Sequence, residues 1–131
     1  MLGYLLTGSQ LNANNLSGPS FPTSIESLCT YNRDECIRGS QSFGTYLESN
    51  GLGIAYPSLS NPKPGSNKFY SGGYITSNYI SQINAIQTEL PYSVRVGVDR
   101  LTYAKNYAQA LVEYMQANNL LRSSSKQKKR Q

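Results

Sequence analysis

The sequence predicts an α/β fold in which a small, partial sheet packs against flanking helices and one long C-terminal helix. Residues 2–6 form an apolar run and residues 83–90 alternate between apolar and polar side chains, and both patterns are typical of strands. After Asp99, apolar residues recur every three or four positions, as on an amphipathic helix. The 131 residues, 38% of them hydrophobic, suit one globular domain.

The first third of the chain predicts short elements joined by polar turns. An Asn- and Gly-rich loop follows the first strand, and a short helix is then expected at residues 23–28. Thr23 or Ser24 can cap this helix, because a hydroxyl at that position accepts a hydrogen bond from a backbone N–H of the first turn. The next segment, around Cys29 and Cys36, is polar and predicts turns.

Cys29 and Cys36 leave three interpretations open. They can be buried or unpaired thiols, which we favour, or they can close a local disulfide in an oxidising compartment. Zinc is the weakest interpretation, because two cysteines without histidine make a poor tetrahedral site. The triplet Asn15-Leu16-Ser17 matches the sequon for asparagine-linked glycosylation, which has meaning only in a secreted protein.

The middle of the chain predicts a helix, a long loop and a flexible turn. The helix is expected at residues 41–49, where Phe43 and Leu47 lie one turn apart and would be buried together. Residues 57–68 contain three prolines and predict a surface loop, and such loops often carry binding function. The pair Gly72-Gly73 allows either a tight hairpin turn or a close approach of the backbone to a ligand.

The predicted strand at residues 83–90 separates its side chains onto two faces. Ile86, Thr88 and Leu90 would face an apolar layer, whereas Gln87 and Glu89 would stand together on the opposite face. Periodicity alone therefore makes Glu89 a solvent-facing strand residue.

The final helix is predicted at residues 99–121, with Asp99 as its cap. Its apolar face consists of residues at a spacing of three and four: Leu101, Ala104, Ala108, Leu111 and Met115. Three tyrosines would widen that face with amphipathic rings: Tyr103, Tyr107 and Tyr114. We expect this face to pack against the sheet.

The net charge of +5 is concentrated in residues 122–131, which hold five of the twelve basic side chains and no acidic one. Residues 1–121 therefore carry seven basic and seven acidic side chains, and we expect no attraction to nucleic acid. We interpret residues 122–131 as a disordered basic tail, with a localisation or nucleic-acid signal as the alternative. No apolar run reaches membrane-spanning length and no signal peptide is visible, so we expect a soluble protein of unspecified compartment.

Histidine is absent from the sequence, and this excludes much enzyme chemistry within the chain. There can be no Ser-His-Asp triad, no Cys-His nucleophile and no histidine-ligated zinc. Glycine-rich phosphate-binding motifs are also missing. Among the acids, Asp34-Glu35 predicts a loop charge pair rather than a general acid and base.

A series of short motifs runs through about three quarters of the chain, and their order and spacing are more specific than any one of them. They include Leu2-Gly3-Tyr4-Leu5-Leu6-Thr7, Arg38-Gly39-Ser40-Gln41-Ser42-Phe43-Gly44, Phe69-Tyr70-Ser71-Gly72-Gly73-Tyr74 and Ile86-Gln87-Thr88-Glu89-Leu90 with Arg95. This series resembles the C-terminal half of the N-formylglutamate amidohydrolase family, which is related to the zinc carboxypeptidase-like hydrolases.

The resemblance implies the C-terminal part of a zinc carboxypeptidase-like fold and the hydrolysis of small N-acyl amino acids. It implies that Glu89 is the general base that accepts the proton of the attacking water. It also places Arg95 and the turn of Gly72, Gly73 and Tyr74 near the substrate, where a guanidinium can hold a carboxylate. The family's metal ligands belong to its N-terminal half, so zinc is expected only in a complete member and no metal ligand is assigned here.

Residues 1–121 are thus interpreted as one partial hydrolase-like domain, a fragment or truncated relative that is inactive alone. Ser77 and Asn78 stand where the family commonly has arginines, so a substrate carboxylate would lack those partners. The expected partners are a metal-binding N-terminal half or a second copy of this chain. The alternative is a non-enzymatic binding or structural protein built on the same scaffold.

Overall fold

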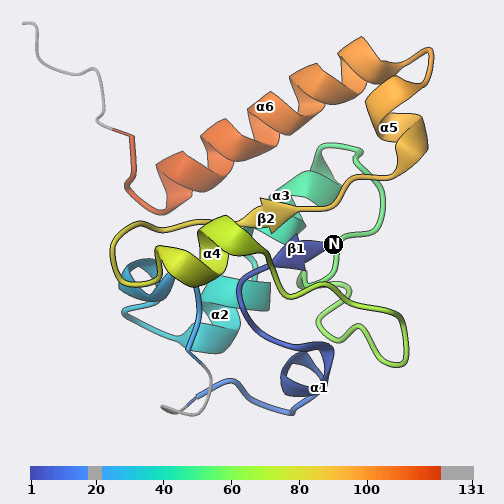
Figure 1. Cartoon of the computed structure of the whole chain (residues 1–131). Coiled ribbons are helices and arrows are strands. Elements are labelled where there is room, and N and C mark those ends of the chain that lie inside the picture. The colour runs from blue at the N-terminus through green and yellow to red at the C-terminus, as the bar shows by residue number, and fades with distance from the viewer. Residues whose placement is uncertain (18–21, 122–131) are drawn as a thin grey trace, which may run out of the picture.

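The computed structural model describes residues 1–17 and 22–121, and it places a small sheet among short helices and one long helix (Figure 1). The elements in chain order are β1 (Leu2–Gly3), α1 (Gly8–Leu11), the 3-10 helix η1 (Glu26–Leu28), α2 (Arg33–Arg38), α3 (Phe43–Ser49), α4 (Tyr74–Asn78), β2 (Gln87–Thr88), α5 (Tyr92–Val96) and α6 (Arg100–Ala117). The predicted α/β class with a long C-terminal helix is confirmed. The predicted tail, residues 122–131, lies outside the described residues.

The strands β1 and β2 are antiparallel neighbours, but the predicted strands at residues 2–6 and 83–90 are too long. Leu2 pairs with Thr88 and Gly3 with Gln87. β1 ends at Gly3 because the chain turns there, and Leu5 adopts a positive φ of 66°. A Cβ atom on Gly3 would lie 2.8 Å from backbone atoms of the segment that holds Ser71 and Gly72, so only glycine permits this approach.

The segment that follows α1 and the segment around the cysteines also differ from prediction. The expected helix at residues 23–28 is only the short η1, because the Thr23 hydroxyl donates to the Tyr4 carbonyl at 2.9 Å instead of capping a helix. The segment predicted to form turns contains α2. Asn32 caps it by accepting a hydrogen bond from the Glu35 N–H at 3.0 Å.

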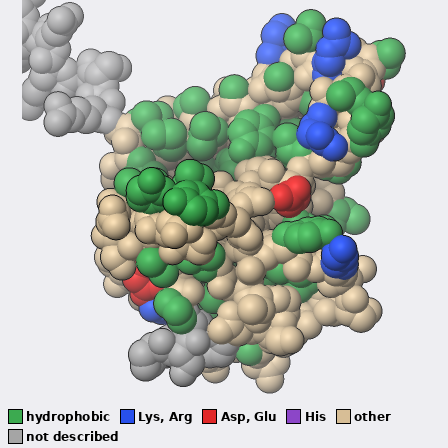
Figure 2. Space-filling view, in the orientation of Figure 1, with side chains coloured by type: hydrophobic (Ala, Val, Ile, Leu, Met, Phe, Trp, Pro, Cys, Tyr) green, Lys and Arg blue, Asp and Glu red, His purple; other side chains and the backbone are tan. Residues whose placement is uncertain are grey.

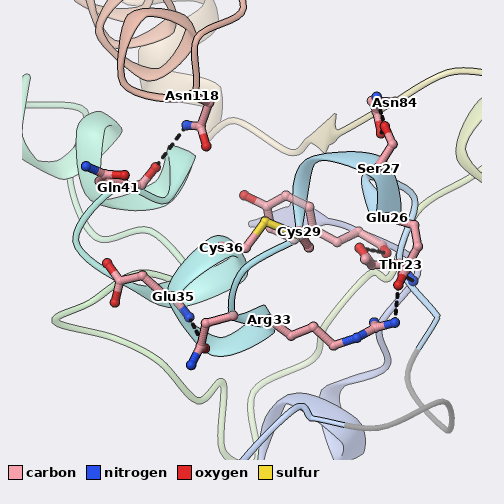
Figure 3. Close-up of a disulfide and its surroundings, with 12 residues drawn as sticks. Thr23, Glu26, Ser27, Cys29, Arg33, Glu35, Cys36, Gln41, Asn84 and Asn118 are labelled. Carbon is pink, nitrogen blue, oxygen red and sulfur yellow. Dashed lines mark hydrogen bonds and ion pairs between the residues drawn. A yellow bond between two sulfur atoms is a disulfide. The ribbon is translucent and has the colours of Figure 1, made fainter.

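Cys29 and Cys36 form a disulfide, which corrects our preference for unpaired thiols (Figure 3). Cys29 follows η1 and Cys36 lies in α2, and the helical turn of α2 brings their Cα atoms to 5.3 Å. An ion pair between Glu26 and Arg33 connects the same two elements. The disulfide therefore joins η1 to α2 at the edge of the core.

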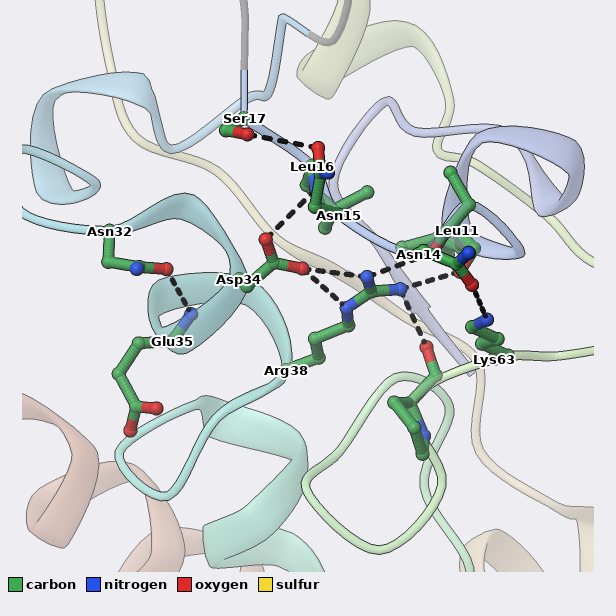
Figure 4. A network of polar contacts seen from close by, with 12 residues as sticks. Leu11, Asn14, Asn15, Leu16, Ser17, Asn32, Asp34, Glu35, Arg38 and Lys63 are labelled. Atoms are coloured by element: carbon green, nitrogen blue, oxygen red, sulfur yellow. Dashed lines mark hydrogen bonds and ion pairs between the residues drawn. The ribbon is translucent and has the colours of Figure 1, made fainter.

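Arg38 is the centre of a polar network that ties α2 to the N-terminal loops (Figure 4). It is 7% exposed and donates to Asp34 Oδ1 through two nitrogens at 2.6 and 2.9 Å. It also donates to the carbonyls of Leu11 at 2.6 Å and Ala13 at 3.0 Å. Asp34 is thus part of a half-buried ion pair within α2, whereas Glu35 accepts from Ser40, and the predicted loop charge pair is wrong.

The helix predicted at residues 41–49 is confirmed as α3, although it begins at Phe43, and Phe43 and Leu47 are buried. α6 packs mainly on α3, and not on the sheet as predicted. α6 begins at Arg100, and Asp99 makes no side-chain cap hydrogen bond. Its predicted apolar face is partly wrong, because four of its residues are exposed: Leu101, Ala104, Ala108 and Leu111. The prediction is correct for Tyr103, Tyr107, Tyr114 and Met115, which are buried or half-buried against the core. Ala110, which was not predicted to face the core, is fully buried.

No helix within residues 1–17 and 22–121 is long and apolar enough to cross a membrane.

Candidate functional site

Glu89 follows β2 and stands beside Gln87, as the strand alternation predicts. Gln87 Nε2 donates to Glu89 Oε1 at 2.8 Å. The Glu89 backbone is held by Met1 through two hydrogen bonds of 2.8 and 2.9 Å. Burial lowers the pKa of the Met1 amino group, and the Glu89 carboxylate acts in the opposite direction. The result is an exposed but oriented carboxylate, the type of group that can accept a proton from water.

The Gly72-Gly73 pair directly precedes α4, with Gly73 at the N-cap position, and is not a hairpin turn. Gly72 has a φ of 141°, and the Gly73 N–H donates to Thr76 Oγ1 at 2.9 Å. A Cβ atom on Gly73 would lie 2.7 Å from Gln87 Oε1, so glycine allows the close approach to Gln87. The turn therefore contacts the residue that orients Glu89. Tyr74 is 72% exposed at the start of α4.

Arg95 lies in α5 and lines a cavity of about 330 Å³ between α5 and α6. A second arginine, Arg100, lines the same cavity, and the other lining residues are Leu90, Val94, Tyr103, Ala104 and Tyr107. The Arg95 guanidinium also lies 6.0 Å from the centre of the Tyr92 ring. Two exposed arginines beside apolar lining residues suit a ligand that combines a carboxylate with an apolar body.

Arg100 is a site residue that was not predicted from the sequence. Its signal is weak, because it stands five residues after Arg95 and belongs to another helix. Only the turn between α5 and α6 brings both arginines to one cavity. The one signal in the sequence is that two arginines stand close together, at positions 95 and 100.

Leu90 lies between the Glu89 carboxylate and the two arginines in the sense that it lines a cavity with each. It lines the cavity that holds Arg95 and Arg100, and it lines a smaller one of about 30 Å³ together with Glu89. Glu89 itself does not line the arginine cavity, and Leu90 is the residue that the two cavities share.

An apolar groove continues from the arginine cavity along α6. Its volume is about 280 Å³, and Tyr107 lines both cavities. The other lining residues are mainly apolar and include Ile25, Leu28, Ile86, Leu111, Met115 and Leu120. Figure 2 shows hydrophobic side chains gathered along this side of α6, with Lys and Arg side chains where α5 meets α6.

The residues present do not fit the zinc site that the resemblance implies. The sequence has no histidine, and the two cysteines are joined in the disulfide. In the part of the chain that the structure describes, no group of three or more Cys, Asp or Glu residues could hold a metal ion.

Comparison of this chain with protein-family models, with curated proteins and with solved structures finds no significant match. The resemblance to N-formylglutamate amidohydrolases therefore rests on the motifs alone and stays a prediction.

Proposed function

We propose that this chain forms part of an amide-hydrolase site for small N-acyl amino acids, of the N-formylglutamate amidohydrolase type. Arg95 and Arg100 hold the substrate carboxylate, and Glu89 accepts the proton of the attacking water. One observation carries the proposal: both arginines line a single cavity, and its wall residue Leu90 directly follows the carboxylate that Gln87 orients.

The roles follow from the chemistry of the side chains. A guanidinium presents donors in a planar fork that matches a carboxylate, and two of them can bind both of its oxygens. The apolar walls formed by Val94 and Ala104 can accept the aliphatic part of an amino acid. Gln87 fixes one oxygen of Glu89, so the carboxylate keeps one orientation relative to the cavity.

The remaining groups of the site belong to a partner in this proposal. Because the residues of this chain do not fit zinc, we derive no metal-dependent step from them. The expected partner is a polypeptide segment with metal-ligating side chains, which corresponds to the N-terminal half of the family. This chain alone is then expected to bind the substrate without hydrolysing it.

The carboxylate-binding role predicts a specific loss of affinity. The isolated chain is expected to bind N-formyl-L-glutamate weakly, and NMR titration should shift the signals of Val94 and Ala104. Arg95→Gln combined with Arg100→Gln should weaken binding by roughly tenfold or more, because the ligand loses two charge-assisted partners. Lys105→Gln on the exposed side of α6 is the matched control and should change little. Equal losses in both variants would contradict the proposed site.

The general-base role predicts a loss of hydrolysis in a reconstituted enzyme. The chain is mixed with the metal-binding half of a related amidohydrolase, and release of formate from N-formyl-L-glutamate is measured. Glu89→Gln should reduce any restored rate by about 10²-fold or more, because the amide keeps the shape but cannot take the proton. Glu113→Gln, which removes a carboxylate from α6 and leaves Glu89 in place, should leave the rate unchanged. Restored activity that does not depend on Glu89 would exclude this role.

A second candidate is a non-enzymatic binding protein for carboxylates with a longer apolar chain. The apolar groove along α6 favours it, because Tyr107 joins this groove to the arginine cavity. In this case the carboxylate of the ligand lies at the two arginines, and the apolar chain of the ligand lies along α6. Affinity should then rise steadily with acyl length from N-acetyl to N-decanoyl glutamate, whereas no such rise is expected for a site limited to small substrates.

A further inference from the structure

The sequon Asn15-Leu16-Ser17 has its two polar residues on the surface and its central residue in the core. Leu16 is 0% exposed, whereas Asn15 and Ser17 are exposed. The Leu16 N–H donates to Asp34 Oδ2 at 3.0 Å, so the triplet is tied to the same Asp34 that binds Arg38 (Figure 4). The buried leucine and this hydrogen bond hold the segment so that both flanking side chains face outwards.

The hydroxyl and the amide of the sequon contact each other. Ser17 Oγ donates to Asn15 Oδ1 at 2.9 Å. This bond uses the amide oxygen and therefore does not occupy Nδ2, the atom to which a glycan is attached. The hydroxyl position is the part of the sequon that distinguishes an acceptor asparagine from other asparagines.

The disulfide supplies an independent observation about the compartment. Cys29 and Cys36 are the only cysteines in the sequence, and they are paired. Disulfides form and persist in secreted proteins and in the lumen of the secretory pathway, and they are rare in the cytosol. Asparagine-linked glycans are likewise a feature of surface positions in secreted proteins. The two features therefore point to the same environment.

We propose that Asn15 is an acceptor for an asparagine-linked glycan. In the reaction, Asn15 Nδ2 forms a bond to the anomeric carbon of an oligosaccharide carried on a lipid pyrophosphate. The bond between that carbon and the pyrophosphate oxygen breaks, and the proton lost from the amide leaves with the lipid pyrophosphate. No oxidation or reduction is involved. The glycan would cover the surface beside Asp34 and Arg38, away from the arginine cavity at α5.

The proposal is tested on the protein purified from the cells that produce it. Mass spectrometry of the peptide that contains residue 15 should show a glycan, and peptide N-glycosidase should convert Asn15 to aspartate. A cysteine assay on the same sample should find no free thiol. Unmodified Asn15 in this sample overturns the proposal, whether or not the disulfide is present.

Variants expressed in eukaryotic secretory cells then test the residue assignment. Asn15→Gln and Ser17→Ala should each abolish the glycosidase-sensitive shift in electrophoretic mobility, whereas Ser17→Thr should keep it. Asn14→Gln is the matched control, because Asn14 is exposed and adjacent but outside the sequon, and it should retain the glycan. If the shift survives in Asn15→Gln, or if it is lost in Asn14→Gln, the assignment to Asn15 is contradicted.

Discussion

Two tyrosine hydroxyls are buried without a hydrogen-bond partner among the described residues, those of Tyr4 and Tyr114. Burial raises the pKa of both phenols, and it raises that of Tyr114 to about 12. The charged phenolate would lose its hydration in the core, so the folded protein favours the neutral form. These two residues therefore link the stability of the fold to alkaline pH.

The raised pKa of Tyr114 predicts a loss of stability above about pH 10. Between pH 10 and about 12 an unfolded tyrosine has lost its proton while Tyr114 in the fold keeps it. The unfolded state then binds fewer protons, so the free energy of unfolding falls as pH rises, by up to about 1.4 kcal/mol per pH unit for each such group. Tyr114→Phe should make this fall less steep in urea titrations, and Tyr74→Phe at an exposed position should not. An unchanged slope in Tyr114→Phe would contradict the prediction.

Some residues of the candidate site were predictable from the sequence and others were not, and the physical reason differs from one residue to the next. The pairing of Gln87 with Glu89 follows from the two-residue period of a strand, which any sequence with that pattern obeys. The placement of Arg95 and Arg100 at one cavity depends on the angle between two helices, which no local pattern encodes. The contact between Gly73 and Gln87 was predictable only in part. Two adjacent glycines indicated a close approach of the backbone, but not that Gln87 is the residue approached.

At the level of elements, α6 shows where periodicity fails. Its helical spacing and the burial of its tyrosines were predicted correctly, but the burial of most of its aliphatic residues was not, because the tyrosines fill the space against the core. The ring of Tyr107 contacts Phe43 at 5.7 Å between centroids, and that of Tyr114 at 5.3 Å. Such aromatic contacts bury a large area, and Leu101 consequently faces solvent. Hydrophobic scales that rank leucine above tyrosine do not anticipate this result.

Helix α3 contains a glycine whose role is steric, and this leads to a prediction about stability. A Cβ atom on Gly44 would lie 2.0 Å from the Pro57 carbonyl oxygen, a backbone atom that cannot move alone. Gly44→Ala should therefore lower the free energy of unfolding by about 1–3 kcal/mol, although alanine is the better helix former. Ser49→Ala on the exposed end of the same helix should change it by about 0.5 kcal/mol or less. Denaturant titration of both variants measures the difference, and a stabilised Gly44→Ala variant would contradict the packing argument.

For the whole molecule, the sequence predicted the class and the order of the main elements better than their extent. β1 and β2 pair as expected, but the loop contacts of Leu5 and Ser24 take over backbone groups that a longer sheet would use. The disulfide was left open because the spacing of Cys29 and Cys36 fits several arrangements. The disulfide depends on how the turn between η1 and α2 orients α2, because Cys29 directly follows η1 and Cys36 lies in α2.

The surface of the whole molecule predicts self-association. Large apolar side chains are exposed where α5 meets α6, among them Tyr92 at 73%, Val98 at 93% and Leu101 at 70%. The described sheet has only two strands, so β2 has no strand on its other edge. An exposed apolar surface and an open strand edge both favour contact with a second copy.

We therefore expect concentration-dependent dimers or larger species in sedimentation velocity between micromolar and millimolar protein. Val98→Thr combined with Leu101→Gln should weaken this association by roughly tenfold, because the contact loses apolar area without a change in charge. Leu59→Gln is the matched control, since Leu59 is 55% exposed but lies in the loop after α3, and it should associate like the wild type. A wild-type chain that stays monomeric at millimolar concentration would contradict the prediction of self-association. Equal weakening in the double variant and in Leu59→Gln would show that the contact does not depend on Val98 and Leu101.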